Sequence, residues 1–159
     1  MIDKPLEAMI GEILMQRELT LAAAESCTGG LVSHRITNVP GSSGYFLGGV
    51  IAYSNATKMS VLGVQAETIE RFGAVSKETV LEMALGVRQA LHADIGIAVS
   101  GIAGPGGGTA EKPVGCTWIG LSASGVDSAS QHIWSGGRLA VKEQSAQAVL
   151  QMLLDYLRD

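Results

Sequence analysis

The segment from Asp94 to Ser100 constrains the fold of this chain more than any other part of its sequence. It reads DIGIAVS, an almost continuous apolar run with the length of one strand. It lacks the regular polar positions of a strand that has one face in water. Runs of this kind belong to strands in the middle of a sheet. We therefore expect a sheet with 94–100 near its centre.

Helical and extended patterns alternate around this run. Apolar residues at helical spacing predict helices over 5–19, 31–39, 55–62, 76–91 and 141–157. Strands are predicted at 20–24, 46–53 and 94–100, and a hairpin is predicted from 114–123 and 128–134 around 125–127. The alternation predicts a single-domain α/β fold over residues 1–159. We expect a three-layer α/β/α sandwich with a mixed, mainly parallel sheet and a C-terminal β-hairpin followed by a closing helix.

Composition and charge exclude several classes of protein. The 159 residues carry a formal net charge of −4 without a basic block, which argues against a nucleic-acid partner. The longest uncharged stretch, 36–57, is polar and turn-rich, so we expect no membrane span. The N-terminal segment carries Asp3, Glu7 and Glu12 and does not match a signal peptide, which predicts a cytoplasmic location.

Cysteine and histidine usage predicts no metal centre. Cys27 and Cys116 lack ligand spacing and are expected to be free thiols. The histidines have no carboxylate or second histidine at ligand spacing, so a Ser-His-Asp triad is not expected either; they are His34, His92 and His132. Glycine, in contrast, is abundant at 21 residues, about twice the usual share of roughly 7%. This abundance favours a site made of loops.

The turn at 25–30 is the first candidate site. Ser26, Cys27 and Thr28 occupy a predicted strand-to-helix turn, where free N–H groups can bind an anion or an oxyanion. Gly29 and Gly30 reduce steric bulk where a ligand would approach. Alternatively, Ser26 or Thr28 only caps the helix. Cys27 is a possible nucleophile, but no histidine has an evident reason to activate it, so serine is preferred.

Lys58 is the second candidate. It follows Asn55 by about one helical turn, so its ammonium can lean back towards the end of the preceding strand and Tyr53. Few charged residues surround it, and burial would lower its pKa, which would make the neutral amine a general base. The alternative is a solvated helix lysine.

Two further segments give weaker signals. The loop at 101–113 is rich in glycine and contains Lys112, but it matches no phosphate-binding fingerprint and is equally compatible with a flexible surface loop. Arg138 follows a Gly-Gly turn at the start of the last predicted helix, where it could hold a phosphate through two hydrogen bonds. An arginine at a helix entry without a ligand is a comparable reading.

Taken together, five ordered motifs resemble the CinA C-terminal domain family over about residues 5–157. Their order and spacing are more specific than any one of them. The motifs are Ala24–Gly30, Tyr53–Asn55 with Lys58, Gly73–Ser76, Ser100–Pro105 with Gly107 and Gly108, and Lys112–Gly115.

The resemblance implies an amidohydrolase that converts nicotinamide mononucleotide to nicotinate mononucleotide and ammonia, without a metal or cofactor. It places the nucleophile on Ser26 and the base on Lys58, with Tyr53 nearby. It also suggests a homo-oligomer. Expected oxyanion or substrate-binding residues are Cys27, Thr28, Gly29, Gly30, Asn55, Gly101, Gly104, Gly107, Gly108 and Arg138. The family pattern has an aspartate before the arginine, and this chain has Gly137 there, which puts in doubt any role for a carboxylate at that place.

Two other functions remain open from the sequence. One is a non-catalytic nucleotide-binding or regulatory module associated with competence or DNA damage, which would bind a ligand without releasing ammonia. The other is a Schiff-base enzyme that uses Lys58.

Overall fold

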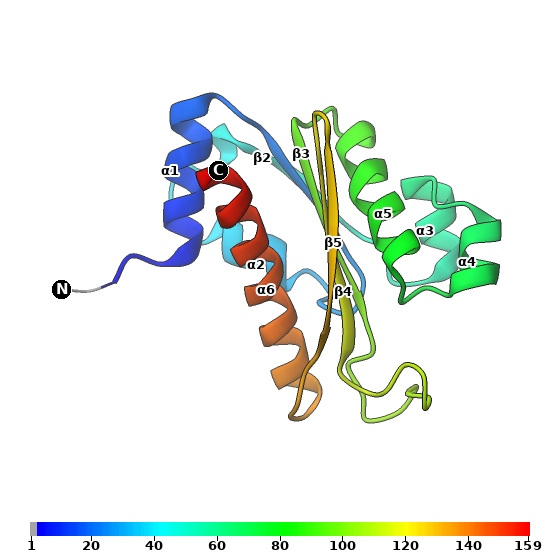
Figure 1. Ribbon diagram of the computed structural model, residues 1–159. Coiled ribbons are helices and arrows are strands. Elements are labelled where there is room, and N and C mark those ends of the chain that lie inside the picture. The colour runs from blue at the N-terminus through cyan, green and yellow to red at the C-terminus, as the bar shows by residue number, and fades with distance from the viewer. Residues whose placement is uncertain (1–2) are drawn as a thin grey trace.

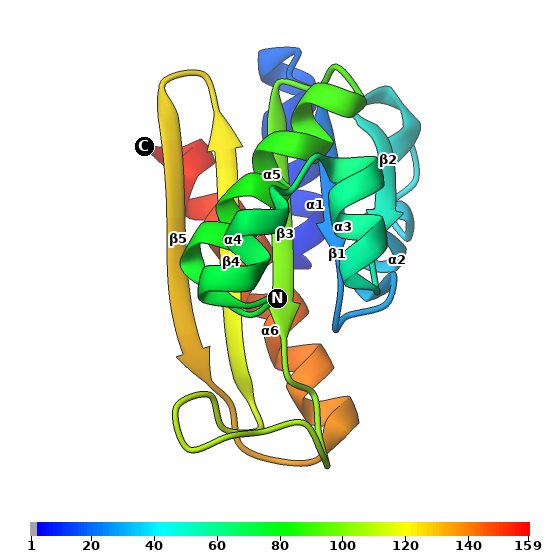
Figure 2. The same ribbon diagram turned by 90° about the vertical axis from the view of Figure 1, so that its right-hand side faces the viewer.

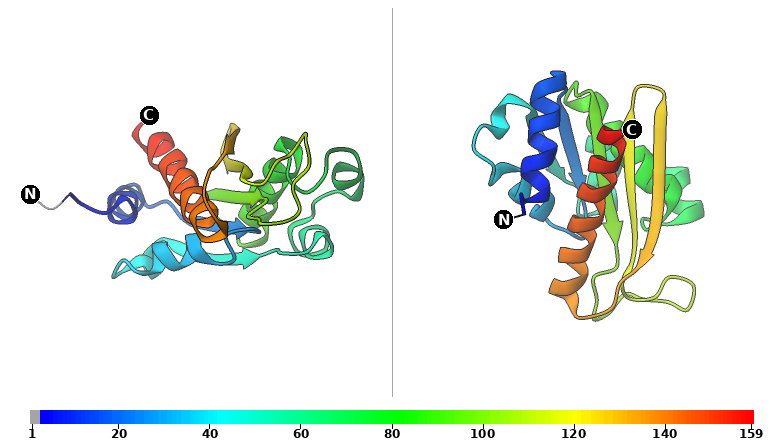
Figure 3. Two further views of the ribbon diagram at one scale, coloured as in Figure 1. Left: turned by 90° about the horizontal axis from the view of Figure 1, so that it is seen from below. Right: turned by 60° about the vertical axis from the view of Figure 1, so that its left-hand side comes forward.

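The computed structural model describes residues 3–159 and has three layers (Figure 1). Helices α1 (Leu6–Arg17), α2 (Leu31–Thr37) and α6 (Arg138–Arg158) cover one face of a sheet. Helices α3 (Asn55–Leu62), α4 (Ala66–Phe72) and α5 (Lys77–Ala90) lie on the other face. Figure 3 shows α1 and α6 side by side on the first face. The expected α/β/α sandwich is confirmed.

The sheet is mixed, as predicted. Its strands are β1 (Leu21–Glu25), β2 (Phe46–Ile51), β3 (Ile95–Gly101), β4 (Cys116–Ala123) and β5 (Val126–Ile133), in the order β2-β1-β3-β4-β5. β1 pairs in parallel with both β2 and β3, whereas β4 is antiparallel to β3 and β5. Only β4 therefore runs against the other strands (Figure 2).

The central position of β3 in the sheet explains its apolar sequence. Its first six residues are buried because helices pack on both faces. Ile97 and Val99 join the core beneath α1, α2 and α6, and Ala98 joins the core beneath α5. Gly96 allows α5 to approach closely, since a Cβ there would lie 2.2 Å from the carbonyl oxygen of Ala84.

The structure differs from the sequence predictions mainly in connections. Helix α4 was not predicted; it is seven residues long and none of its residues is buried, so its helical pattern is short and weak. The hairpin turns at 124–125, earlier than predicted, because Gly125 adopts a φ of 72° and Ala123 pairs with Val126. Helix α6 begins at Arg138 rather than at Val141. No helix within residues 3–159 has both the length and the apolar character needed to cross a membrane.

The topology brings several chain segments to one edge of the sheet. The parallel strands β1, β2 and β3 end at this edge, and β5 also ends there before α6 begins. The connection from β1 to β2 contains α2, and the connection from β2 to β3 contains α3, α4 and α5 on the opposite face. The chain thus leaves β1 and reaches β3 on opposite sides of the sheet. Ligands of open α/β sheets bind at such a switch point.

Candidate active site

A cavity of about 200 Å³ lies at this edge of the sheet. It combines the residues that follow β1 and β2 with the end of β3, the connection before α5 and the start of α6. Its lining consists of Ser26, Cys27, Tyr53, Asn55, Lys58, Ala74, Val75, Ser100, Gly101, Ala103 and Arg138. The two strongest candidates from the sequence, Ser26 and Lys58, therefore share one cavity.

Lys58 and Ser26 are in direct contact. The Nζ atom of Lys58 lies 3.0 Å from Ser26 Oγ, 2.9 Å from the carbonyl oxygen of Ala52 and 3.2 Å from that of Tyr53. Helix α3 produces this arrangement because its N-cap, Ser54, accepts a hydrogen bond from the Thr57 N–H and so starts the helix just after β2. Lys58, in the first turn, can then reach back to the strand end.

The surroundings of Lys58 favour its neutral form. The residue is 1% exposed, and this burial lowers the pKa of its ammonium from the ordinary value of 10.5. None of the ion pairs within residues 3–159 involves Lys58. With no carboxylate paired to it, the amine lacks the usual stabilisation of its charged form and is suited to accept a proton.

Glu25 organises the turn that carries Ser26, a role that the sequence analysis missed. Its buried carboxylate accepts hydrogen bonds from the N–H groups of Gly30, Val32 and Ser33 and from the Ser33 hydroxyl, at 2.7 to 3.2 Å. The first N–H groups of α2 are thus already occupied. A glutamate five residues before the N-cap Gly30 was the available signal, although it lies far outside the usual capping positions.

This capping changes which groups are free to bind an oxyanion. The N–H of Gly29 donates to the Ser26 carbonyl, and the N–H of Gly30 donates to Glu25, so neither glycine supplies a free donor. The N–H groups of Cys27 and Thr28 have no hydrogen-bond acceptor among residues 3–159. Neither Gly29, Gly30 nor Thr28 lines the cavity. Of the expected oxyanion groups, the backbone N–H of Cys27 is the one that lacks an acceptor in another residue and belongs to a residue that lines the cavity.

Tyr53 and Arg138 form the outer rim. The Tyr53 side chain is 60% exposed, and its hydroxyl oxygen accepts a hydrogen bond from Arg138 Nη2 at 2.9 Å. Arg138 Nη1 donates to the carbonyl oxygen of Gly104 at 2.8 Å. Arg138 therefore ties the rim tyrosine to the loop that follows β3.

The glycine-rich loop contributes only its first residues to the cavity. Gly101 lines it, and Gly104 contacts Arg138, but Gly107 and Gly108 do not line it. The loop turns away instead, and Lys112 Nζ binds the carbonyl oxygen of Phe72 at the end of α4. Gly107 and Gly108 therefore do not form part of the cavity, and their contact with a substrate stays a prediction. Asn55 does line the cavity.

Four lining residues were not assigned a role from the sequence: Ala74, Val75, Ser100 and Ala103. Among them, Ser100 is polar and 1% exposed, and its hydroxyl donates to the carbonyl oxygen of Ala74 at 2.7 Å. This bond joins the end of β3 to the connection before α5. The position of Ser100 at the carboxyl end of the central strand was a signal for a site residue.

Cys27 is a poor nucleophile despite its place in the cavity. Burial raises the pKa of its thiol to about 12, so almost none of it is thiolate at neutral pH. Cys116 is also a free, buried thiol. Within the described part of the chain, no group of three or more His, Cys, Asp or Glu residues has a metal-binding arrangement.

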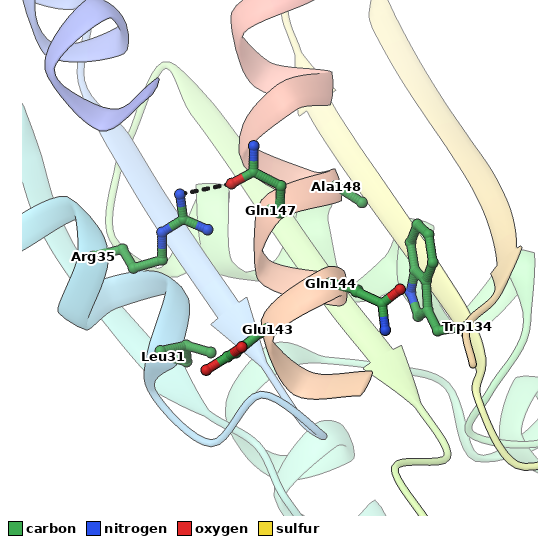
Figure 4. Close-up of a pocket in the computed structure, with 7 residues that line it drawn as sticks. All are labelled: Leu31, Arg35, Trp134, Glu143, Gln144, Gln147 and Ala148. Carbon is green, nitrogen blue, oxygen red and sulfur yellow. Dashed lines mark hydrogen bonds between the residues drawn. The ribbon is translucent and has the colours of Figure 1, made fainter. Parts of the chain in front are cut away.

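A larger cavity of about 560 Å³ lies between α2 and α6 (Figure 4). Arg35 faces it but is bound to Glu7 and to Gln147, the latter at 2.8 Å. No serine, cysteine or lysine lines this cavity, and the pair of Ser26 and Lys58 lies elsewhere. Its lining is Leu31, Arg35, Trp134, Glu143, Gln144, Gln147 and Ala148. The candidate chemistry therefore belongs to the smaller cavity.

A family model and individual relatives point to the same group of proteins. The family model described as the CinA C-terminal domain matches residues 3–157. A competence-damage inducible protein of Moorella thermoacetica is 52% identical over 156 residues, and a CinA-like protein of Chloroherpeton thalassium is 48% identical over 159. Each match covers 98% of this chain, which spans only 38% of either relative.

Solved structures show the same fold. The competence damage-inducible protein A of Klebsiella pneumoniae superposes with a TM-score of 0.93 at 33% identity, covering 96% of this chain and 95% of the other. The competence/damage inducible protein CihA of Agrobacterium tumefaciens gives a TM-score of 0.88 at 36% identity, with both chains covered completely.

Proposed function

Because this chain belongs to the CinA C-terminal domain family, we propose that it is an amidohydrolase that hydrolyses the carboxamide of nicotinamide mononucleotide without a metal. The observation that carries the proposal is the contact between buried Lys58 and Ser26. The substrate comes from the family resemblance. The reaction type is supported by the geometry of these two residues.

The hydrogen bonds of Lys58 orient its lone pair. A neutral amine has two N–H donors and one lone pair. The carbonyl oxygens of Ala52 and Tyr53 are acceptors only, so they take the two N–H groups. The lone pair then points to Ser26 Oγ and accepts its proton. Two backbone carbonyls thus hold the base in the geometry needed to activate serine.

The proposed reaction proceeds through an acyl-enzyme. Lys58 accepts the Ser26 proton while Oγ attacks the carboxamide carbon, and the N–H of Cys27, which lines the cavity, holds the oxyanion. The C–N bond then breaks, and Lys58 returns the proton to the departing ammonia. Water, deprotonated by Lys58, attacks the ester. The proton finally returns to Ser26 as the C–O bond of the ester breaks, and the carboxylic acid product leaves and releases its proton to solvent.

The size of the cavity indicates which part of the substrate it holds. Its volume of about 200 Å³ is below the range of roughly 300–1,000 Å³ that is usual for pockets that bury most of a ligand. A carboxamide on an aromatic ring fits such a space beside Ser26. The sugar and phosphate would then lie at the rim, near Tyr53 and the start of α6.

Ammonia release from nicotinamide mononucleotide tests the proposal. We expect turnover by the parent chain with chelator present. Ser26→Ala should reduce it to background, and Lys58→Met should reduce it by at least about 100-fold. Exposed residues provide matched controls, and Ser43→Ala and Lys77→Met should retain parental rates. Binding of the nucleotide by the folded parent without ammonia release would contradict the proposal and favour a binding module.

A further inference from the structure

Two cations lie one turn apart near the start of α6, on the same side of the helix. Arg138 and Lys142 are separated by four residues, the spacing of neighbours on a helix surface. The guanidinium of Arg138 is already bound to the Tyr53 hydroxyl and the Gly104 carbonyl. These hydrogen bonds hold Tyr53 and the loop after β3 in place at the rim of the cavity. Lys142 has no hydrogen-bond or ion-pair partner within residues 3–159.

The ammonium of Lys142 lies over the turn that carries Ser26. Its Nζ is 3.6 Å from the place that a Cβ on Gly29 would occupy. Its charge also reaches the cavity, since it favours the thiolate of Cys27 and partly opposes the rise of that pKa. Gly29 is exposed and Lys142 is partly exposed, so a ligand at the rim can reach both from solvent.

Other cations around the cavity are unsuitable for a phosphate. Lys58 is buried and bound to carbonyl oxygens. Arg35 is paired with Glu7, and Lys112 is bound to Phe72. Since the cavity is too small for a whole nucleotide, a phosphate must lie outside it, and a phosphate dianion needs a cation.

We propose that Lys142 binds the phosphate of the nucleotide substrate, at the open side of the Ser26 turn, while Arg138 positions Tyr53 and the loop after β3. This inference rests on the proposed function for the identity of the substrate. It assigns the phosphate contact to Lys142 rather than to Arg138, which was one candidate from the sequence. It also makes Lys142 the residue that distinguishes a nucleotide from its dephosphorylated riboside.

Kinetics on two substrates test this assignment. For nicotinamide mononucleotide, Lys142→Met should raise KM about 10- to 100-fold, as expected for loss of a hydrogen bond to a charged group. Its kcat should stay within about threefold, because the lost contact is the same in ground and transition states. With nicotinamide riboside, which has no phosphate, Lys142→Met should leave KM and kcat unchanged. Lys142→Arg should restore the parental KM for nicotinamide mononucleotide. Lys77→Met is the matched control and should leave both constants unchanged.

Calorimetry separates this proposal from the proposed function. In the inactive Ser26→Ala chain, added Lys142→Met should weaken binding of nicotinamide mononucleotide about 10- to 100-fold. Equal binding with and without Lys142 would overturn the proposal even if the parent releases ammonia. If Lys142→Met weakens nucleotide binding but the parent chain releases no ammonia, the phosphate site is supported and the deamidase activity is refuted.

Discussion

The pKa of Lys58 is the residue-scale quantity on which the proposed chemistry depends. Burial lowers it from 10.5, which increases the neutral fraction of the amine at physiological pH. The hydroxyl of Ser26 and two carbonyl oxygens are the only polar groups bound to its nitrogen within the described residues. Lys58 is thus kept as a base by the absence of a counter-charge.

This arrangement predicts a one-sided pH profile. The active form has neutral Lys58, so kcat/KM should be full above the pKa of Lys58 in the folded chain and should fall as pH decreases through it. That midpoint should lie below 10.5. The measurement is ammonia release across pH 5 to 10 with buffers of constant ionic strength. Activity that stays level to the lowest pH at which the chain is folded would exclude Lys58 as the base.

The same burial predicts a stability cost. Because the folded pKa of Lys58 is lowered, the unfolded chain binds a proton that the folded chain does not, over the pH range between the two pKa values. Lys58 therefore imposes no such cost above about pH 10.5, and the free energy of unfolding decreases as the pH falls from there towards the folded pKa of Lys58. Lys58→Met should lower activity at least about 100-fold yet raise the free energy of unfolding at pH 7 by about 1 kcal/mol. Urea denaturation at pH 7 and pH 10 measures this gain, which should shrink at the higher pH.

At the scale of elements, the turn between β1 and α2 depends on Glu25. One buried carboxylate satisfies three backbone N–H groups and one hydroxyl. It also occupies donors that would otherwise compete with the N–H of Cys27 for an anion. The cap therefore defines both the start of the helix and the place of the oxyanion site.

Removal of this cap should destabilise the chain. Glu25→Ala leaves four donors without this acceptor, one of them buried and three partly buried, and we expect the free energy of unfolding to fall by about 3 kcal/mol or more. Glu67, in the first turn of α4, is an exposed counterpart, paired only with Arg71. Glu67→Ala should cost less than about 0.5 kcal/mol. Comparable losses for both variants in urea denaturation would show that Glu25 is not a structural cap.

Helix α5 depends on a close approach at Gly86. A Cβ at this position would lie 1.8 Å from the carbonyl oxygen of Leu62, at the end of α3. Gly86→Ala should therefore lower the free energy of unfolding by about 2 kcal/mol, although alanine is the better helix former. At Gly106 no atom lies within 4 Å of an added Cβ. Thermal unfolding should be unchanged for Gly106→Ala, and an equal drop in Tm for the two variants would contradict the packing argument.

For the whole molecule, the topology explains why one edge of the sheet carries the candidate site. β1, β3 and the start of α6 meet at the switch point, and the connection before α5 closes the cavity from the other face. The opposite ends of the same strands contribute no lining residue.

The assembly expected from the family resemblance remains a prediction. The edge strand β2 has one paired side, and Leu47 and Ile51 are 44% and 52% exposed on it. We expect sedimentation equilibrium to give a mass that is a multiple of 16.5 kDa. A mass of one chain across the micromolar range would show a monomer and remove the expected homo-oligomer.

Much of the site was accessible from the sequence because its pieces are local. The turn at 25–30 and the Tyr53–Lys58 segment each follow a strand closely, so short-range spacing predicted that Ser26 lies in a strand-to-helix turn and that Lys58 leans towards a strand end. The pairing of the two was implied only by the family resemblance. They are 32 residues apart, and no periodic pattern connects them.

By itself, the sequence determined the α/β/α sandwich and its central strand, since apolar periodicity is a property of neighbouring residues. The tertiary structure alone decided that Arg138 binds a hydroxyl 85 residues away, that Glu25 occupies the helix donors, and that Gly107 and Gly108 lie outside the cavity. These outcomes depend on which strand ends the sheet brings together. Local spacing carries no information about such contacts between distant segments.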